Sequence, residues 1–103
     1  MDIFEWLYSI EDRMVWEIGS NSLHDLQLAL YGYASALRSF DPNAGDPMYP
    51  GFQRFVEDHY DMKDTPLGWP EIINGHEPDT GAALKTFYTL LRKYRNSLPF
   101  SWC

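Results

Sequence analysis

The side chains that could do chemistry in this sequence are three histidines, one cysteine and a run of acidic residues near the middle. His59 lies among Glu57, Asp58 and Asp61, and an imidazole beside carboxylates can bind a metal ion or act as a general base. On a helix, however, His59 points about 100° away from Asp58, so the donors do not share a face. The default interpretation of all three histidines is therefore a packed or surface side chain, with no metal site.

The sequence contains no motif for phosphate binding or acyl transfer. It has no Gly-rich phosphate loop and no Gly-x-Ser-x-Gly turn. Its one cysteine, Cys103, cannot form an internal disulfide or a structural zinc site. An intermolecular disulfide is the alternative to an incidental terminal thiol. We expect no catalytic residues, no enzymatic activity and no cofactor.

Charge divides the chain into an acidic body and a basic end. Residues 1–79 carry fifteen acidic and four basic side chains, a balance of −11, whereas residues 80–103 carry four basic side chains and no acidic ones, which gives the net charge of −7. Such a body would repel phosphates, so we expect no nucleic-acid partner. Three of the four terminal cations fall in the last turns of a predicted helix, where the helix dipole favours them. The acidic body instead fits a cationic partner.

Nine of the fifteen acidic residues lie between positions 41 and 79. A solvated helix face is one interpretation of this run. The other is a surface matched to a basic protein, because complementary charge speeds encounter and rejects wrong partners. Tight binding also needs aromatic anchors, which Tyr60 and Trp69 could provide unless they belong to the core. The predicted partner-binding residues are Glu57, Asp58, Tyr60, Asp61, Asp64, Trp69 and Glu71.

Four segments repeat apolar residues with the helical period of 3.6 residues. The first covers residues 3–10, the second runs from a cap at 20–22 to residue 40, the third covers 52–60 and the last begins at 79 or 80. Residues 69–73 are predicted to form a short helical turn. Residues 11–20 are expected to be extended before a turn at Gly19, and 41–50 to be a loop. Gly32 inside the second helix indicates close packing of a neighbouring helix.

The fold class predicted from these elements is all-α, a small antiparallel bundle of four main helices in a single domain spanning residues 1–103. The apolar C-terminal tail is expected to fold back onto the body. No apolar run reaches the roughly 20 residues of a membrane span, and acidic residues stand where a signal peptide carries basic ones. We therefore expect no membrane partner and a cytoplasmic location.

Short motifs along most of the chain resemble a family of small bacterial proteins. The matching positions are Trp6, Arg13, Ile18-Gly19, Ser22-Leu23, Leu26, Gly32-Tyr33, Gly51-Phe52, Phe55-Val56, Gly68-Trp69, Phe87-Tyr88 and Leu91. The family's Pro and Met-Tyr between the Arg and the Gly are replaced here by residues 14–17. These proteins resemble immunity proteins of bacterial polymorphic toxin systems, including contact-dependent growth inhibition. The resemblance implies a cytoplasmic antidote that binds a toxin domain, often a nuclease, and it implies no catalytic residues.

Two functions follow as hypotheses. The first is an immunity protein that binds a cognate basic toxin domain, a nuclease, and neutralises it by covering the active site. The alternative is a non-enzymatic helical scaffold or adaptor that self-associates through its aromatic C-terminal segment. A homo-oligomer is thus possible under the alternative, but the first hypothesis does not predict one.

Overall fold

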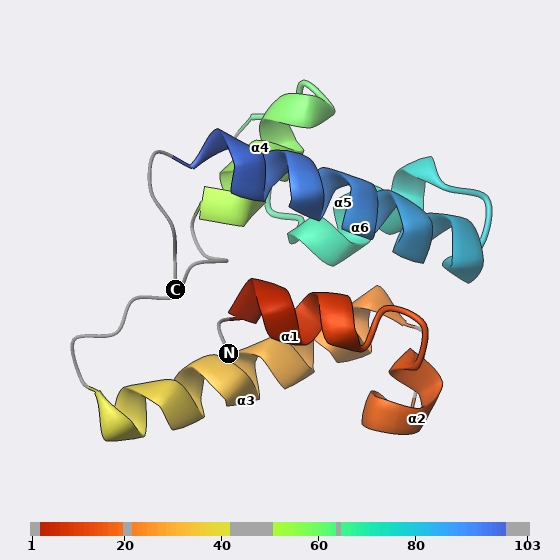
Figure 1. Ribbon diagram of the computed structural model, residues 1–103. Helices are drawn as coiled ribbons and strands as arrows, with labels where there is room; N and C mark the ends of the chain where they lie inside the picture. Colours follow the sequence, from red (N-terminus) through yellow and green to blue (C-terminus); the bar gives the residue numbers. More distant parts are fainter. Residues whose placement is uncertain (1–2, 20–21, 42–50, 64, 99–103) are drawn as a thin grey trace.

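The computed structural model describes residues 3–19, 22–41, 51–63 and 65–98. These residues form no strand, and their helices are α1 (Ile3–Ser9), α2 (Met14–Ile18), α3 (Leu23–Phe40), α4 (Gly51–His59), α5 (Trp69–His76) and α6 (Thr80–Ser97). Figure 1 shows two layers, with α1, α2 and α3 in one and α4, α5 and α6 in the other. The predicted all-α class is confirmed. The predicted loop covers residues 41–50, of which 42–50 lie outside the described residues, as does the C-terminal tail from residue 99 onward.

The two long helices begin at side-chain caps that the sequence signalled. The Ser22 hydroxyl accepts a long 3.5 Å hydrogen bond from the backbone N–H of Asp25, and the Asp79 carboxylate accepts one of 2.8 Å from Ala82. Such caps satisfy backbone donors that the first helical turn leaves free. Helix α3 ends at Phe40, as predicted from the proline that follows Asp41.

Residues 11–20 differ from the extended segment that we predicted. They contain the short helix α2, which ends at Gly19 with a left-handed φ of 77°. Ile10 and Met14 are both buried, and their spacing of four residues places them on one face of a helical path. The apolar alternation around Trp16 suggested an extended approach to the turn, but the Trp16 side chain is 89% exposed.

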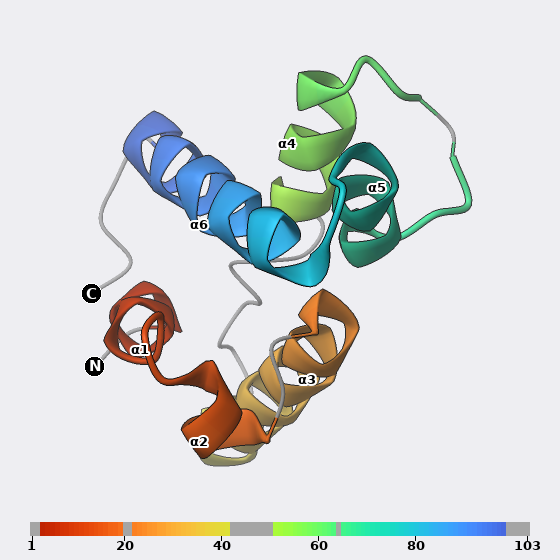
Figure 2. The same ribbon diagram turned by 90° about the vertical axis from the view of Figure 1, so that its right-hand side faces the viewer.

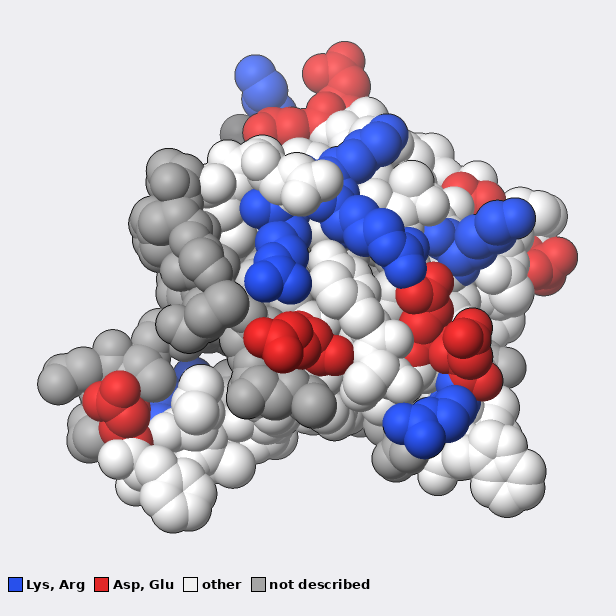
Figure 3. All heavy atoms as spheres, in the orientation of Figure 1, with Lys and Arg blue, Asp and Glu red and all other residues white. Residues whose placement is uncertain are grey.

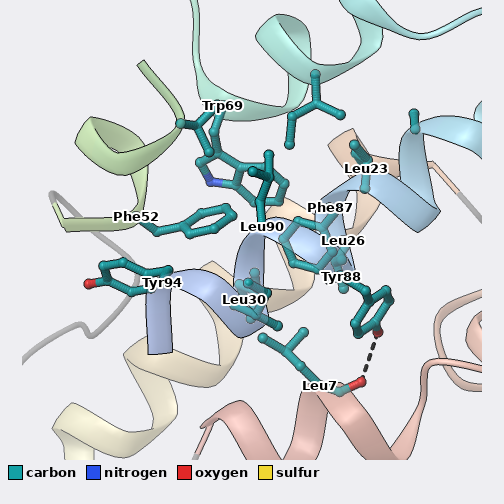
Figure 4. Close-up of a cluster of buried hydrophobic side chains, with 14 of the residues drawn as sticks. Leu7, Leu23, Leu26, Leu30, Phe52, Trp69, Phe87, Tyr88, Leu90 and Tyr94 are labelled. Atoms are coloured by element: carbon teal, nitrogen blue, oxygen red, sulfur yellow. Dashed lines mark hydrogen bonds between the residues drawn. The ribbon is translucent and has the colours of Figure 1, made fainter. Parts of the chain in front are cut away.

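Aromatic rings from α4, α5 and α6 form the centre of the core (Figure 4). The Phe87 ring stacks on Trp69 with centroids 5.0 Å apart, and the Phe52 ring meets Phe87 edge-on at 5.6 Å. Tyr94 contacts Phe52 at 5.5 Å and extends the cluster toward α1, where Phe4 lies 6.2 Å away. Aromatic pairs in these geometries add about 0.5–1.5 kcal/mol each beyond area burial. Leucines of α1 and α3, which belong to the other layer, complete the core.

Helix α6 joins the two layers through a buried hydrogen bond. The Tyr88 hydroxyl donates to the Leu7 carbonyl at 2.8 Å, a contact between residues 81 positions apart (Figure 4). Burial raises the pKa of Tyr88 strongly, the nearby carboxylates of Glu11 and Asp12 add to the rise, and the Arg92 guanidinium opposes it. The hydroxyl therefore keeps its proton and remains a donor throughout the neutral range.

The basic cluster of α6 packs onto α1. The Arg92 guanidinium pairs with Glu11 and lies 5.4 Å from the Tyr8 ring centroid, while Arg95 lies 5.2 Å from the Phe4 ring. In Figure 3 the basic side chains gather over α6 and acidic side chains lie beside them. An exposed ion pair contributes about 0–1 kcal/mol, and exposed cation–π contacts about 0.5–1 kcal/mol each. Arg92 and Arg95 thus have intramolecular partners near the N-terminal helix.

Helices α4 and α5 run in the same direction, whereas we predicted antiparallel neighbours. The first turns of α4 and α5 meet where Trp69 N–H donates to the Gln53 side chain. The C-terminal ends of the two helices meet where Tyr60 stacks on His76. Figure 2 shows the segment between them returning along the outside of the pair. The connection of residues 60–68 is long enough for this return, whereas a short loop would have placed the two helices antiparallel. Helix α5 also exceeds the short turn predicted at 69–73.

Gly32 was predicted to permit close helix packing, and the structure contradicts this. A Cβ atom added at Gly32 would meet no heavy atom within 4 Å, and the residue is exposed. The buried face of α3 is instead formed by Leu23, Leu26, Leu30 and Ala34. The glycine therefore lies on the opposite side of the helix from its partners.

Candidate functional site

The predicted acidic cluster divides into two groups in the structure. Asp58 and Asp61 are exposed at the far end of α4, next to the end of α5. Glu57 instead lines a cleft against α3, and Glu71 lies at the start of α5, beside the same cleft. Asp64 lies outside the described residues. The folded chain therefore offers two neighbouring acidic surfaces rather than one continuous face.

Asp61 has a structural role in addition to its charge. Its φ of 54° is left-handed, and it follows α4 in the position where a helix commonly places glycine or asparagine. Met62 N–H donates to the Glu57 carbonyl at 2.8 Å and Asp61 N–H donates to the Asp58 carbonyl at 3.2 Å. These two bonds are those of a Schellman motif. Within the described residues, no lysine or arginine pairs with Asp58 or Asp61, so their carboxylates face solvent.

Tyr60 lies between two histidine rings. It stacks on His76 with centroids 4.0 Å apart, and His59 meets it edge-on at 4.7 Å. Burial raises the pKa of Tyr60, and the Glu77 carboxylate raises it further. The Nδ1 atom of His76 lies 2.8 Å from the Ile72 carbonyl, a distance that favours the tautomer with a proton on Nδ1. Tyr60 is thus a half-buried ring held by its neighbours.

Trp69 does not form an exposed anchor, and this part of the predicted site requires correction. Its side chain is only 4% exposed and packs between Phe52 and Phe87. The first turn of α5 faces both α4 and α6, so a large ring at this position fills the core. The sequence had left this interpretation open as the competing one.

An open cleft lies between α3, α4 and the chain leading into α5, and it is here called the α3–α4 cleft. Its volume is about 220 Å³, and it is lined by Gln27, Tyr31, Gln53, Glu57, Thr65, Pro66, Leu67 and Gly68. Cofactor and drug-sized ligands occupy pockets of about 300–1,000 Å³. The cleft is therefore too small for such a ligand and suits a single side chain or a small ion.

Gln53 holds the walls of this cleft together. Its side-chain carbonyl accepts a 2.7 Å hydrogen bond from Trp69 N–H, and its amide nitrogen lies 3.0 Å from the Leu67 carbonyl and 2.8 Å from Oε2 of Glu57. Helix α5 has no side-chain cap of its own, because Gly68 precedes it. Gln53 thus supplies the capping acceptor from a different helix and fixes the Glu57 carboxylate.

The rim of the cleft combines negative charge with exposed apolar surface. The Tyr31 and Leu67 side chains are 51% and 43% exposed. Oε1 of Glu71 lies 3.8 Å from Nδ1 of His24, which is an ion pair only when the histidine is protonated. No lysine or arginine lines the cleft. This is a surface with the charge and shape to receive a cation.

Of the residues that line the cleft, the predicted site contained only Glu57. Tyr31 lies off the apolar stripe of α3, and a large aromatic residue on the polar side of a helix is a signal that could have identified it. Gln53 and Leu67 carried no signal, because their importance depends on contacts 14 and 16 residues along the chain. Sequence spacing alone does not show that α4 and α5 begin side by side.

The described residues contain no group of three or more His, Cys, Asp or Glu side chains that could hold a metal ion. None of their helices combines the length and the apolar character required to cross a bilayer. Comparisons with protein-family models, curated proteins and solved structures find no match to this chain. The functional argument therefore depends on the site itself.

Proposed function

We propose that this protein is a cytoplasmic immunity protein that binds a basic toxin domain, a nuclease, and neutralises it by covering its active site. The observation that carries the proposal is the pair of exposed carboxylates, Asp58 and Asp61, beside a cleft that contains Glu57 and is bordered by exposed Tyr31. Carboxylates attract a cationic partner, and an exposed aromatic ring provides contact area at low entropy cost. The net charge of −7 adds long-range attraction.

A nuclease is the toxin that this surface suits best, because its active site must bind phosphates. The same cationic groups that hold a nucleic-acid backbone would bind carboxylates of an acidic antidote. Binding of this kind blocks substrate without any chemical step. The proposed role therefore requires only a stable fold with a negative, partly apolar surface.

The direct test is binding to the product of the adjacent upstream gene. Purified protein should form a complex with that product, and the toxin's nuclease activity should be lost at a ratio of one to one. The association rate should fall steeply as salt increases, because charge acts mainly on encounter. Absence of binding to that product, or binding that high salt does not change, would contradict the proposal.

Charge variants identify the surface. Asp58→Asn and Asp61→Asn, singly and together, should slow association several-fold at low salt. Asn is tolerated in the left-handed conformation of Asp61, so the fold should survive. Asp12→Asn is the matched control, because it removes one exposed charge from the turn between α1 and α2. An equal effect of the control would mean that net charge alone matters.

The second candidate function is a helical scaffold that self-associates. It is favoured by the exposure of Trp16 and Phe40, whose side chains are 89% and 90% accessible. The C-terminal segment that we predicted for this role lies outside the described residues. Sedimentation at several concentrations separates the candidates, since a tight homodimer that is lost on removal of residues 98–103 supports the scaffold.

A further inference from the structure

We propose that the α3–α4 cleft receives one arginine side chain of the protein partner. The inference deepens the proposed function and rests on it for the nature of the partner. The cleft itself, however, can be tested without any toxin. Arginine is identified by the size, charge and lining of the cleft.

Size excludes most other occupants. A volume of about 220 Å³ is below the range of cofactor pockets but accommodates a long side chain entering from the surface. The cleft is open to solvent, and Tyr31 and Leu67, two of the residues that line it, are 51% and 43% exposed. An entering side chain would therefore meet an aromatic ring and an aliphatic side chain as well as the polar groups.

Charge requires that the occupant be a cation. Glu57 contributes a carboxylate to the wall, and no lysine or arginine of the cleft neutralises it. Gln53 contacts Oε2 of Glu57 at 2.8 Å, which leaves the other carboxylate oxygen to accept from a ligand. The Glu71 carboxylate lies against Gly68, where an added Cβ atom would be 2.9 Å from Oε2. One carboxylate thus lines the cleft, and a second lies beside Gly68, which also lines it.

Geometry favours arginine over lysine. A guanidinium is planar, donates several hydrogen bonds in fixed directions and stacks on aromatic rings. Tyr31 provides the ring, and Glu57 provides a carboxylate whose position Gln53 fixes. Because this acceptor is already held in place before the ligand arrives, little conformational entropy is lost on binding.

The test uses N-acetyl-arginine amide as the probe, titrated into the isolated protein and followed by NMR. The expected result is millimolar binding that shifts the Gln53 side-chain amide and the Gly68 backbone amide. N-acetyl-citrulline amide has a nearly identical shape without the charge, and it should not bind. N-acetyl-lysine amide should bind more weakly than the arginine probe. Shifts confined to Asp58 and Asp61, or equal binding of the citrulline probe, would overturn the assignment.

Two matched variants locate the binding site. Glu57→Gln keeps an acceptor for Gln53 while removing the charge, and it should weaken binding of the arginine probe roughly tenfold or more. Asp58→Asn removes the same charge one residue away, outside the cleft, and should change probe binding less than twofold. Equal effects of the two variants would show a diffuse attraction and refute the cleft. Thermal unfolding of both variants should match that of the parent.

The outcomes separate this inference from the proposed function. If the toxin binds and Glu57→Gln weakens the complex no more than the control variant Asp12→Asn does, the cleft assignment fails while the proposed function stands. If the arginine probe binds in the cleft and the neighbouring gene product does not bind, the proposed function fails while the cleft assignment stands.

Discussion

Replacing Gln53 by alanine should destabilise the protein by about 2 kcal/mol, because one side chain serves three structural partners. It accepts from Trp69 N–H and donates toward the Leu67 carbonyl and the Glu57 carboxylate. Loss of a helix-capping acceptor costs about 0.5–2 kcal/mol, and each further hydrogen bond contributes about 0.5–1.5 kcal/mol. Water can replace Gln53 as a partner of the half-exposed groups, and alanine has a helix propensity that is better by a few tenths of a kcal/mol. The expected cost is therefore below the sum of the three hydrogen-bond contributions.

The measurement is urea denaturation followed by tryptophan fluorescence, with thermal unfolding as a second probe. For a domain of this size, about 2 kcal/mol corresponds to a fall of about 8–16 °C in Tm. Gln27→Ala is the matched control, because Gln27 lines the same cleft and its side chain makes no hydrogen bond to the described residues. It should change stability by less than about 0.5 kcal/mol.

A second substitution separates the two roles of Gln53. Gln53→Glu keeps an oxygen that can accept from Trp69 N–H, but it loses the donor and places like charges four residues apart with Glu57. The loss of stability caused by Gln53→Glu should be larger than that of the control Gln27→Ala and smaller than that of Gln53→Ala. Added salt should reduce this loss, because it screens the repulsion between the two carboxylates. If Gln53→Ala costs less than about 0.5 kcal/mol, or no more than Gln27→Ala, the idea that Gln53 caps α5 from α4 is wrong.

Two further predictions concern the rest of the fold. Tyr88→Phe should cost about 1–2 kcal/mol in urea denaturation, because the buried bond to the Leu7 carbonyl is lost. Since the folded-state pKa of Tyr88 is raised above its unfolded value of about 10, the stability it contributes is full below pH 10 and declines as pH rises further. Tyr88→Phe should therefore show a shallower loss of stability above pH 10, and an unchanged slope would refute this. Gly32→Ala should stabilise the protein by about 0.5–1 kcal/mol, as nothing lies near the added methyl group, and destabilisation would contradict the open position of this glycine.

The helices themselves could be predicted from the sequence, because they depend on local signals. The apolar period, cap candidates at 20–22 and at 79–80 and the proline after Asp41 indicated α3 and the start of α6, and the structure selects Ser22 and Asp79 as the caps. The same logic failed at α2, where a five-residue helix is too short for the period to appear. Local signals also misjudged Gly32, since a glycine in a helix does not reveal which face it occupies.

Composition and the acidic run were also evident from the sequence, whereas the division of that run into two surfaces was decided by tertiary structure. Adjacent residues on a helix point about 100° apart, but only the packed positions of α3 and of residues 65–68 make the side of Glu57 a cleft and leave Asp58 exposed. Trp69 became core because α5 lies against both α4 and α6. The parallel course of α4 and α5 follows from Gln53 and Tyr60, each of which contacts a residue 16 positions later. Such contacts depend on how the helices pack, and no local pattern of charge or hydrophobicity encodes them.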